Sequence, residues 1–224
     1  MSIKQNLLNI LKELPSDVKL VAVSKFHPVE AILEAYDSGQ RVFGENRPQE
    51  LLSKAQALEG KDISFHFLGH LQTNKLKMVL PYVDMVESVD SIHLLKAVDD
   101  WGRNNGKIIN VLLELHIAAE QTKQGFAEEE ILDIMFNAGS YKNIRICGLM
   151  GMATNTDDEE TISGDFARIS DFMSYLQDLF PEYEDFKELS IGMSGDWKIA
   201  LDYGCTIVRI GTAIFGERNQ NFFK

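Results

Sequence analysis

The chain has 224 residues, of which 45% are hydrophobic, and this is enough to build a large buried core. Its 34 acidic residues outnumber its 22 basic residues, and the net charge of -12 leaves no basic stripe for nucleic acid. An acidic surface also argues against anionic membranes. Residues 1–12 lack the pattern of a signal peptide, and no apolar stretch reaches the roughly 18 residues of a membrane span. We therefore expect a soluble, cytoplasmic protein that binds neither nucleic acid nor membranes.

Short β-rich segments alternate with helix-length amphipathic segments along the chain. The segments between the strands carry helix signals: Pro28 suits a first helical turn, and apolar residues recur at helical spacing in Thr161–Phe180 before Pro181. Eight rounds can be counted, with strands predicted at Val18–Lys25, Arg41–Glu45, Ile63–Gly69, Met85–Val89, Ile108–Ile117, Ile144–Met152, Leu189–Met193 and Ile207–Phe215.

Several of these strands are too continuously apolar for a sheet with one solvent face, as in Val111–Leu113 and Ile144–Cys147. Such strands are typical of a parallel sheet that is buried on both faces. Eight strand–helix units without a linker predict an α/β fold, a single-domain TIM-type (β/α)8 barrel over residues 1–224. The alternative is an open doubly wound sheet, which is disfavoured because no Gly-x-Gly-x-x-Gly turn follows an early strand.

The cysteines and histidines indicate neither a disulfide framework nor a metal site. Cys147 lies in an apolar run and Cys205 follows a glycine, and neither has a metal-ligand or Cys-x-x-Cys spacing. His66 and His70 have no carboxylate or cysteine at ligand spacing. We expect two core thiols and no bound metal.

A single amine, that of Lys25, closes the first predicted strand. An α/β barrel keeps its chemistry at the C-terminal ends of its strands, so this lysine lies where a functional group is expected. Contact with Val21, Val23 and Phe26 would desolvate the ammonium group and favour the neutral amine, which condenses with aldehydes. The alternative is a solvated lysine that only ends a strand.

The segments after the seventh and eighth strands have the composition of a phosphate site. They read Gly192–Trp197 (GMSGDW) and Val208–Thr212 (VRIGT). Barrels often bind phosphate at these two places, where glycines such as Gly211 let the backbone approach an anion. The hydroxyl groups of Ser194 and Thr212 can each donate a hydrogen bond to it.

Arg209 precedes Gly211 by two residues, so both share one face of the predicted strand and point inward together. An inward arginine needs a partner. One candidate is a carboxylate of the core such as Glu114, and the other is the ring nitrogen of pyridoxal phosphate, whose aldehyde Lys25 would hold as a Schiff base. Because a guanidinium group only donates hydrogen bonds, this ring nitrogen would stay largely unprotonated and the ring would be a weak electron sink.

Six motifs occur in an order that resembles the pyridoxal phosphate homeostasis proteins, the YggS/PROSC group, which are similar to the N-terminal barrel of bacterial alanine racemase. The resemblance covers essentially the whole chain. The motifs are Val21–Lys25 (VAVSK), Phe43–Glu50 (FGENRPQE), Phe67–Lys75 (FLGHLQTNK), Gly148–Met152 (GLMGM), Leu189–Ser194 (LSIGMS) and Val208–Thr212 (VRIGT).

This resemblance implies roles for six residues around the cofactor. They are Lys25 for the Schiff base, Asn46 beside the ring, Ser194, Gly211 and Thr212 at the phosphate, and Arg209 toward the ring nitrogen. One departure from the family pattern is Gly195-Asp196-Trp197, where many members carry two acidic residues and a methionine. It leaves the detail of that loop's rim open.

Several neighbouring residues have two interpretations. The family often carries a second lysine shortly after the first, where this chain reads Phe26-His27-Pro28. His27 can relay protons, but we favour a surface histidine at a helix start. Asn46 can also be a helix N-cap, and three residues either line the pocket or only begin a helix, namely Gln72, Asn74 and Lys75.

A racemase needs two acid–base groups on opposite faces of the substrate carbon, and in alanine racemase the second is a tyrosine from a further domain. We expect no such domain here, and the six tyrosines fall in predicted helices or loops. The chain is therefore predicted to be a non-enzyme that binds pyridoxal phosphate reversibly and takes part in its homeostasis. Transfer to apo-enzymes as partners is implied by the resemblance alone.

Two enzymatic alternatives use the same lysine and anion site. One is a racemase-like pyridoxal-phosphate enzyme, and the other is a cofactor-free Schiff-base lyase that acts on a sugar phosphate. Without the second domain of a racemase, its usual dimer interface is missing, and we expect a monomer.

Overall fold

The structure, a computed structural model, describes residues 2–120 and 124–217. Within these residues, eight parallel strands close into a barrel in which each strand pairs with its neighbours in sequence and β1 pairs with β8. The strands are β1 Lys19–Val23, β2 Val42–Glu45, β3 Ser64–Phe67, β4 Met85–Val89, β5 Ile109–Glu114, β6 Ile144–Met150, β7 Glu188–Ser190 and β8 Ile207–Ile210.

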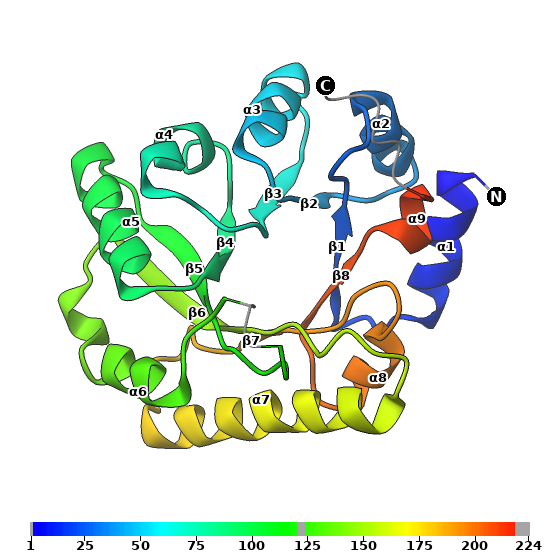
Figure 1. The fold of residues 1–224 in the computed structure, drawn as a ribbon. Coiled ribbons are helices and arrows are strands. Elements are labelled where there is room, and N and C mark those ends of the chain that lie inside the picture. The colour runs from blue at the N-terminus through cyan, green and yellow to red at the C-terminus, as the bar shows by residue number, and fades with distance from the viewer. Residues whose placement is uncertain (1, 121–123, 218–224) are drawn as a thin grey trace.

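Helices surround the barrel on its outside, and α1 packs beside α2 and α9 (Figure 1). The α-helices are α1 Ile3–Glu13, α2 Val29–Asp37, α3 Pro48–Ala57, α4 Leu76–Val79, α5 Ile92–Asn105, α6 Glu128–Phe136, α7 Glu159–Leu179, α8 Trp197–Leu201 and α9 Thr212–Phe215. Two short 3-10 helices occur within residues 2–120 and 124–217, η1 Thr73–Lys75 and η2 Ala138–Ser140. The predicted (β/α)8 barrel is confirmed, as is the long helix before Pro181.

Six of the predicted strands end earlier than expected, and two of these differences affect the candidate site. The strand predicted at Ile207–Phe215 stops at Ile210, because the backbone of Gly211 leaves the extended region and residues 212–215 form α9. The first strand stops at Val23, so Lys25 lies in a turn beyond the strand and not at its last position. Both corrections move candidate site residues out of the strands: Lys25 lies in a turn, Gly211 follows β8 and Thr212 begins α9.

The core has two layers, because alternate residues of each strand point inward and outward. The outward residues pack against the helices, and Phe43 and Phe67 are fully buried there. The interior holds a smaller apolar cluster, made of Val21, Met85, Leu112, Cys147, Met150 and Ile207. Polar residues take the other interior positions and form part of the site described below.

Both cysteines are buried, and burial raises the pKa of each thiol to about 11. This agrees with the expectation of core thiols. Among the helices of the described residues, none combines the length and the apolar character that crossing a membrane requires.

Gly148 supplies the first testable prediction, since it adopts a φ of 150° where β6 passes β7. A Cβ atom at this position would clash with the backbone carbonyl oxygen of Glu188. We expect Gly148→Ala to lower the free energy of unfolding by about 3 kcal/mol, measured by urea denaturation.

The matched control is Gly164→Ala, because Gly164 lies exposed within α7 with open space around it. That variant should gain about 0.5–1 kcal/mol from the better helix propensity of alanine. Equal urea concentrations at the unfolding midpoint for wild type and Gly148→Ala would contradict the close contact of Gly148 with Glu188.

Candidate functional site

A cavity of about 410 Å³ opens at the C-terminal end of the barrel strands. It gathers all six residues that the sequence predicted to bind a cofactor, from the turn after β1, the loops after β2 and β7, strand β8 and the start of α9. They are Lys25, Asn46, Ser194, Arg209, Gly211 and Thr212. An amine, two hydroxyl groups, an amide and a guanidinium group thus face one space, while their binding to a cofactor stays a prediction.

Lys25 lies in a tight turn that the His27 N–H closes by donating to the Ser24 carbonyl at 3.1 Å. The third residue of this turn, Phe26, has a φ of 65°, a left-handed conformation that is rare for an aromatic residue. Such strained residues cluster at binding and active sites, where the surrounding structure enforces them. The lysine side chain is half-buried and lines the cavity.

Ser194 connects the loop after β7 to the start of α9. Its hydroxyl oxygen accepts hydrogen bonds from the N–H groups of Gly211 at 3.2 Å and Ala213 at 3.4 Å. The hydroxyl proton itself can be donated to an anion. Together with the exposed Thr212 in the same cavity, Ser194 gives this wall the donors that a phosphate group requires.

Residues 195–197, which differ from the family pattern, affect only their own loop and the start of α8. Asp196 accepts a hydrogen bond from the Met193 N–H, and Trp197 is buried at the start of α8. Gly195 lines the cavity. The changed residues therefore stabilise the loop and its helix, and they leave the hydroxyl group of Ser194 in place.

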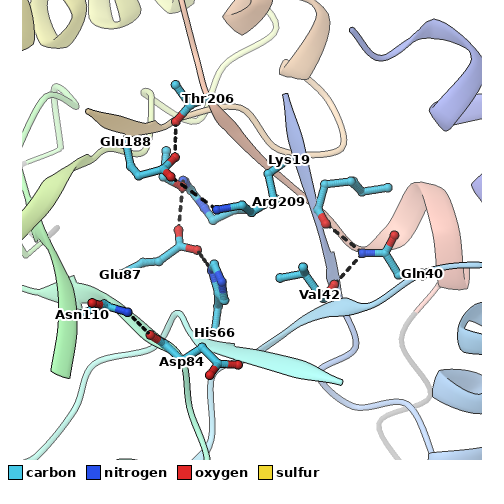
Figure 2. Close-up of polar contacts among 12 residues, drawn as sticks. Lys19, Gln40, Val42, His66, Asp84, Glu87, Asn110, Glu188, Thr206 and Arg209 are labelled. Carbon is cyan, nitrogen blue, oxygen red and sulfur yellow. Dashed lines mark hydrogen bonds and ion pairs between the residues drawn. The ribbon is translucent and has the colours of Figure 1, made fainter. Parts of the chain in front are cut away.

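Arg209 is 5% exposed and points into the barrel. It donates to the Ser190 hydroxyl at 2.6 Å and to the Gly151 carbonyl at 2.9 Å. Ser190 in turn donates to Glu87 at 2.5 Å, and the other oxygen of Glu87 lies 2.5 Å from His66 Nδ1 (Figure 2). A chain of buried polar groups thus runs from the cavity floor through the barrel interior.

The charged groups of this row of polar residues affect each other's pKa. Burial would raise the pKa of Glu87, but the hydrogen bond from His66 and the charges of His66 and Arg209 outweigh it and lower that pKa. Burial lowers the pKa of Arg209, and the charges of Glu87 and Glu114 oppose this. Arg209 is therefore fixed by Ser190 and Gly151, while Glu114 acts on it only through its charge.

Asn46 offers an independent test of whether a ligand fits. Its side-chain oxygen is buried and has no hydrogen-bond partner, although Asn46 lines the cavity. Unpaired buried polar atoms are uncommon in folded proteins, and a donor on a bound ligand would satisfy this one. The N-cap of α3 is Arg47, so the interpretation of Asn46 as a helix cap was wrong.

The interpretation of His27 as a surface residue was also wrong. His27 is 9% exposed and lines the cavity, and its ring stacks on Phe215 with ring centroids 5.2 Å apart. The three residues left open after β3 lie at the short helix η1, outside the described lining of the cavity. They are Gln72, Asn74 and Lys75.

Sequence reasoning missed the polar chain beneath Arg209. A signal was present, since Glu87 lies within the strand Met85–Val89 and a carboxylate in a fully buried strand requires a partner. The identity of that partner, His66 one strand away, depends on the parallel register and was beyond reach. Among the described residues, no group of histidine, cysteine and acidic side chains could hold a metal ion.

A second hollow of about 470 Å³ lies at the opposite end of the barrel. Its wall includes Arg145 and Asp185, which form an ion pair at 3.0 Å. These two charges satisfy each other, and the hollow contains none of the groups that the sequence indicated for chemistry. The cavity around Lys25 is therefore the candidate site.

Comparison with known proteins first shows the class of protein to which this barrel belongs. The family model described as alanine racemase, N-terminal domain, matches residues 1–219. An alanine racemase of Clostridium difficile shares the fold, with a TM-score of 0.77 at 17% identity over 98% of this chain and 57% of that one. The protein is thus an alanine racemase N-terminal-type barrel.

The relatives narrow this class. Proteins named pyridoxal phosphate homeostasis protein match at 36% identity, from Vibrio alginolyticus over 98% of this chain and 99% of the relative, and from Aquifex aeolicus over 89% and 87%. The chain belongs to this family of pyridoxal phosphate homeostasis proteins, as its six motifs predicted.

Solved structures agree with this assignment. PipY of Synechococcus elongatus PCC7942 without pyridoxal phosphate superposes with a TM-score of 0.91 at 35% identity, over 96% of this chain and all of that one. The same protein with pyridoxal phosphate bound gives a TM-score of 0.88 at 34% identity and the same coverage.

Glu114 makes the stability of the barrel depend on pH. It is 5% exposed at the end of β5, and burial, with a smaller contribution from Asp90, raises its pKa to about 7. The folded state therefore holds this proton more tightly than the unfolded state. Its contribution is fully present below about pH 4.5 and is lost as the pH rises through about 7.

We expect Glu114→Gln to remove up to about 3 kcal/mol of the stability that wild type loses between pH 5 and pH 8. Urea unfolding at several pH values measures this difference. The control is Glu188→Gln, a half-buried carboxylate at the other end of the barrel. Parallel pH profiles for wild type and Glu114→Gln would show that Glu114 does not titrate in this range.

Proposed function

We propose that the protein binds pyridoxal phosphate reversibly through a Schiff base on Lys25, and that it serves in the homeostasis of this cofactor without catalytic turnover. One observation carries the proposal. The amine of Lys25 lines the same cavity as the hydroxyl groups of Ser194 and Thr212 and the guanidinium of Arg209. These groups match the aldehyde, the phosphate and the ring nitrogen of one small molecule.

Each residue has a task that its chemistry suits. Lys25 supplies the nucleophilic amine, and imine formation on one lysine is readily reversed by an incoming amine. Ser194 and Thr212 donate hydrogen bonds to the phosphate, and the backbone of Gly211 lines the cavity beside them. The bound cofactor supplies the aldehyde and the electron-accepting ring.

Arg209 limits what that ring can do. Its position is fixed by Ser190 and Gly151, so it presents a donor and a positive charge to the cavity. A ring nitrogen that accepts from a guanidinium stays unprotonated and stabilises a carbanion poorly. This property favours storage of the cofactor over catalysis.

The enzymatic alternative would need a second proton carrier. No tyrosine belongs to the described lining of the cavity, but His27 does, and its imidazole is the group that would favour an enzyme. His27 lies in the same turn as Lys25 and packs on Phe215, a position that supports the cavity wall. We therefore assign His27 to the wall and keep the non-catalytic function.

The proposal also includes the location of the protein, its oligomeric state and its partners. We place the protein in the cytoplasm as a monomer, with pyridoxal phosphate as its ligand and apo-enzymes that require this cofactor as recipients. The open mouth of the cavity at the barrel end supports exchange of a small molecule without a subunit interface.

Borohydride reduction of the pyridoxal-phosphate-treated protein, followed by peptide mass mapping, tests the proposal. We expect a stable pyridoxyl adduct on Lys25 in wild type and its loss in Lys25→Ala. Lys198→Ala is the control, because Lys198 is an exposed surface lysine. Adducts spread over surface lysines in wild type and in both variants would contradict the cofactor proposal and favour a sugar-phosphate lyase.

Exchange of the α-proton of amino acids in deuterated water separates carrier from enzyme. The loaded protein should exchange this proton no faster than free pyridoxal phosphate at equal concentration. Exchange that depends on both Lys25 and His27 would identify a racemase-like enzyme instead.

A further inference from the structure

Three charged side chains are buried beneath the turn that carries Lys25. Lys54 and Glu50 lie one helical turn apart in α3 and are 2% and 4% exposed, while Glu45 at the end of β2 is fully buried. Lysine and glutamate are almost never buried to this extent unless they are paired. The candidate functions above assign them no task.

These side chains bind the backbone on both sides of Lys25. Lys54 Nζ lies 2.7 Å from Glu45 Oε1 and 3.3 Å from Glu50 Oε2, and it donates to the Ser24 carbonyl at 2.8 Å. Glu50 Oε2 accepts the Phe26 N–H at 2.8 Å. The residue between these two anchored positions is Lys25.

The anchored turn contains the strained residue Phe26, with its φ of 65°. Its ring packs under the guanidinium of Arg47 at 4.3 Å, and Arg47 also pairs with Glu50 at 3.6 Å. An aromatic residue keeps a left-handed conformation only where its surroundings over-determine it. The hydrogen bond that the Phe26 N–H donates to Glu50 and the cover of Arg47 provide that constraint.

Stability alone is a poor explanation for this cluster. Buried ion pairs are often no more stabilising than apolar residues of the same volume, because the charges lose their hydration. Here burial raises the pKa of Glu45, and its second oxygen has no hydrogen-bond partner. The cluster is therefore costly to bury, and two of its hydrogen bonds, at Ser24 and Phe26, hold the backbone on either side of Lys25.

We propose that Glu50 and Lys54 are positioning residues, which hold the Ser24–His27 turn so that the amine of Lys25 faces the cavity. This inference rests on the proposed function, since it assumes that Lys25 forms the bond with pyridoxal phosphate. Without the acceptor of Glu50, the Phe26 N–H is released and the turn relaxes. The lysine then spends less time in a reactive position, and bond formation slows.

The test compares Glu50→Ala with Glu50→Gln, because glutamine keeps an oxygen that can accept the Phe26 N–H. The matched control is Glu188→Ala, which removes a half-buried carboxylate far from the turn. The first readout is the rate of bond formation with pyridoxal phosphate, followed by absorbance and confirmed on Lys25 by reduction. The second is binding of pyridoxine 5′-phosphate, an alcohol that cannot condense with an amine.

We expect Glu50→Ala to slow bond formation about 10-fold or more, and Glu50→Gln to stay within about 3-fold of wild type. Pyridoxine 5′-phosphate should bind all variants within about 2-fold, since the phosphate wall is unchanged. Bond formation at the wild-type rate in Glu50→Ala would overturn the inference. A parallel loss of pyridoxine 5′-phosphate binding would also overturn it, because Glu50 would then support the whole cavity.

Hydrogen exchange of the Phe26 amide gives a readout without any cofactor. It should be about 10-fold faster in Glu50→Ala than in wild type and unchanged in Glu188→Ala. If wild type forms no bond at Lys25, the proposed function fails, whereas this exchange still reports whether Glu50 holds the turn. If Glu50→Ala does not fold, Glu50→Asp replaces it, because the shorter side chain keeps a carboxylate beside Lys54 but withdraws it from the Phe26 N–H. Unchanged amide exchange in that variant would overturn the inference.

Discussion

The site depends on one set of contacts, the parallel pairing of β1 with β8 that closes the barrel. Lys19 to Ala22 lie opposite Ile207 to Ile210 in this pairing, so the first strand of the chain lies beside the last. Closure thereby brings the turn of Lys25 next to Gly211 and Thr212, almost two hundred residues later. An open sheet would leave these groups at opposite edges, and no cavity would bring the amine of Lys25 together with Gly211 and Thr212.

Buried charged groups lie on both the inner and the outer face of the barrel strands. On the inner face, Arg209 is held by Ser190, and the chain through Glu87 to His66 supplies the charge that a buried guanidinium requires. On the outer face, Glu45 and its neighbours in α3 constrain the turn of Lys25. Charged groups thus lie beneath both Arg209 and the turn of Lys25, and in each case they make hydrogen bonds next to a group that lines the cavity.

Much of this could be predicted from the sequence, because strand periodicity and motif order are local properties. The eight strands, the inward direction of Arg209 and the meeting of Lys25 with Ser194 at one barrel end all follow from alternation and from the rules of parallel barrels. The end of β8 was placed too late, since Ile210 to Phe215 remain apolar while Gly211 turns the chain into a helix.

The parts that could not be predicted depend on contacts between elements. Lys54 in an amphipathic helix has the pattern of a surface residue, and only the packing of α3 against β2 shows that it is buried with Glu45. His27 was assigned to the surface because a helix start is usually exposed, whereas packing on Phe215 of α9 covers it. Such pairings between packed elements have no signature in a single sequence.

A crystal structure of the protein soaked with pyridoxal phosphate shows whether Lys25 holds the cofactor in this cavity. We expect electron density that is continuous from Lys25 Nζ to the cofactor, with the phosphate against Ser194 and Thr212 and the ring nitrogen facing Arg209. Cofactor density that is separate from Lys25, or that lies outside this cavity, would contradict it.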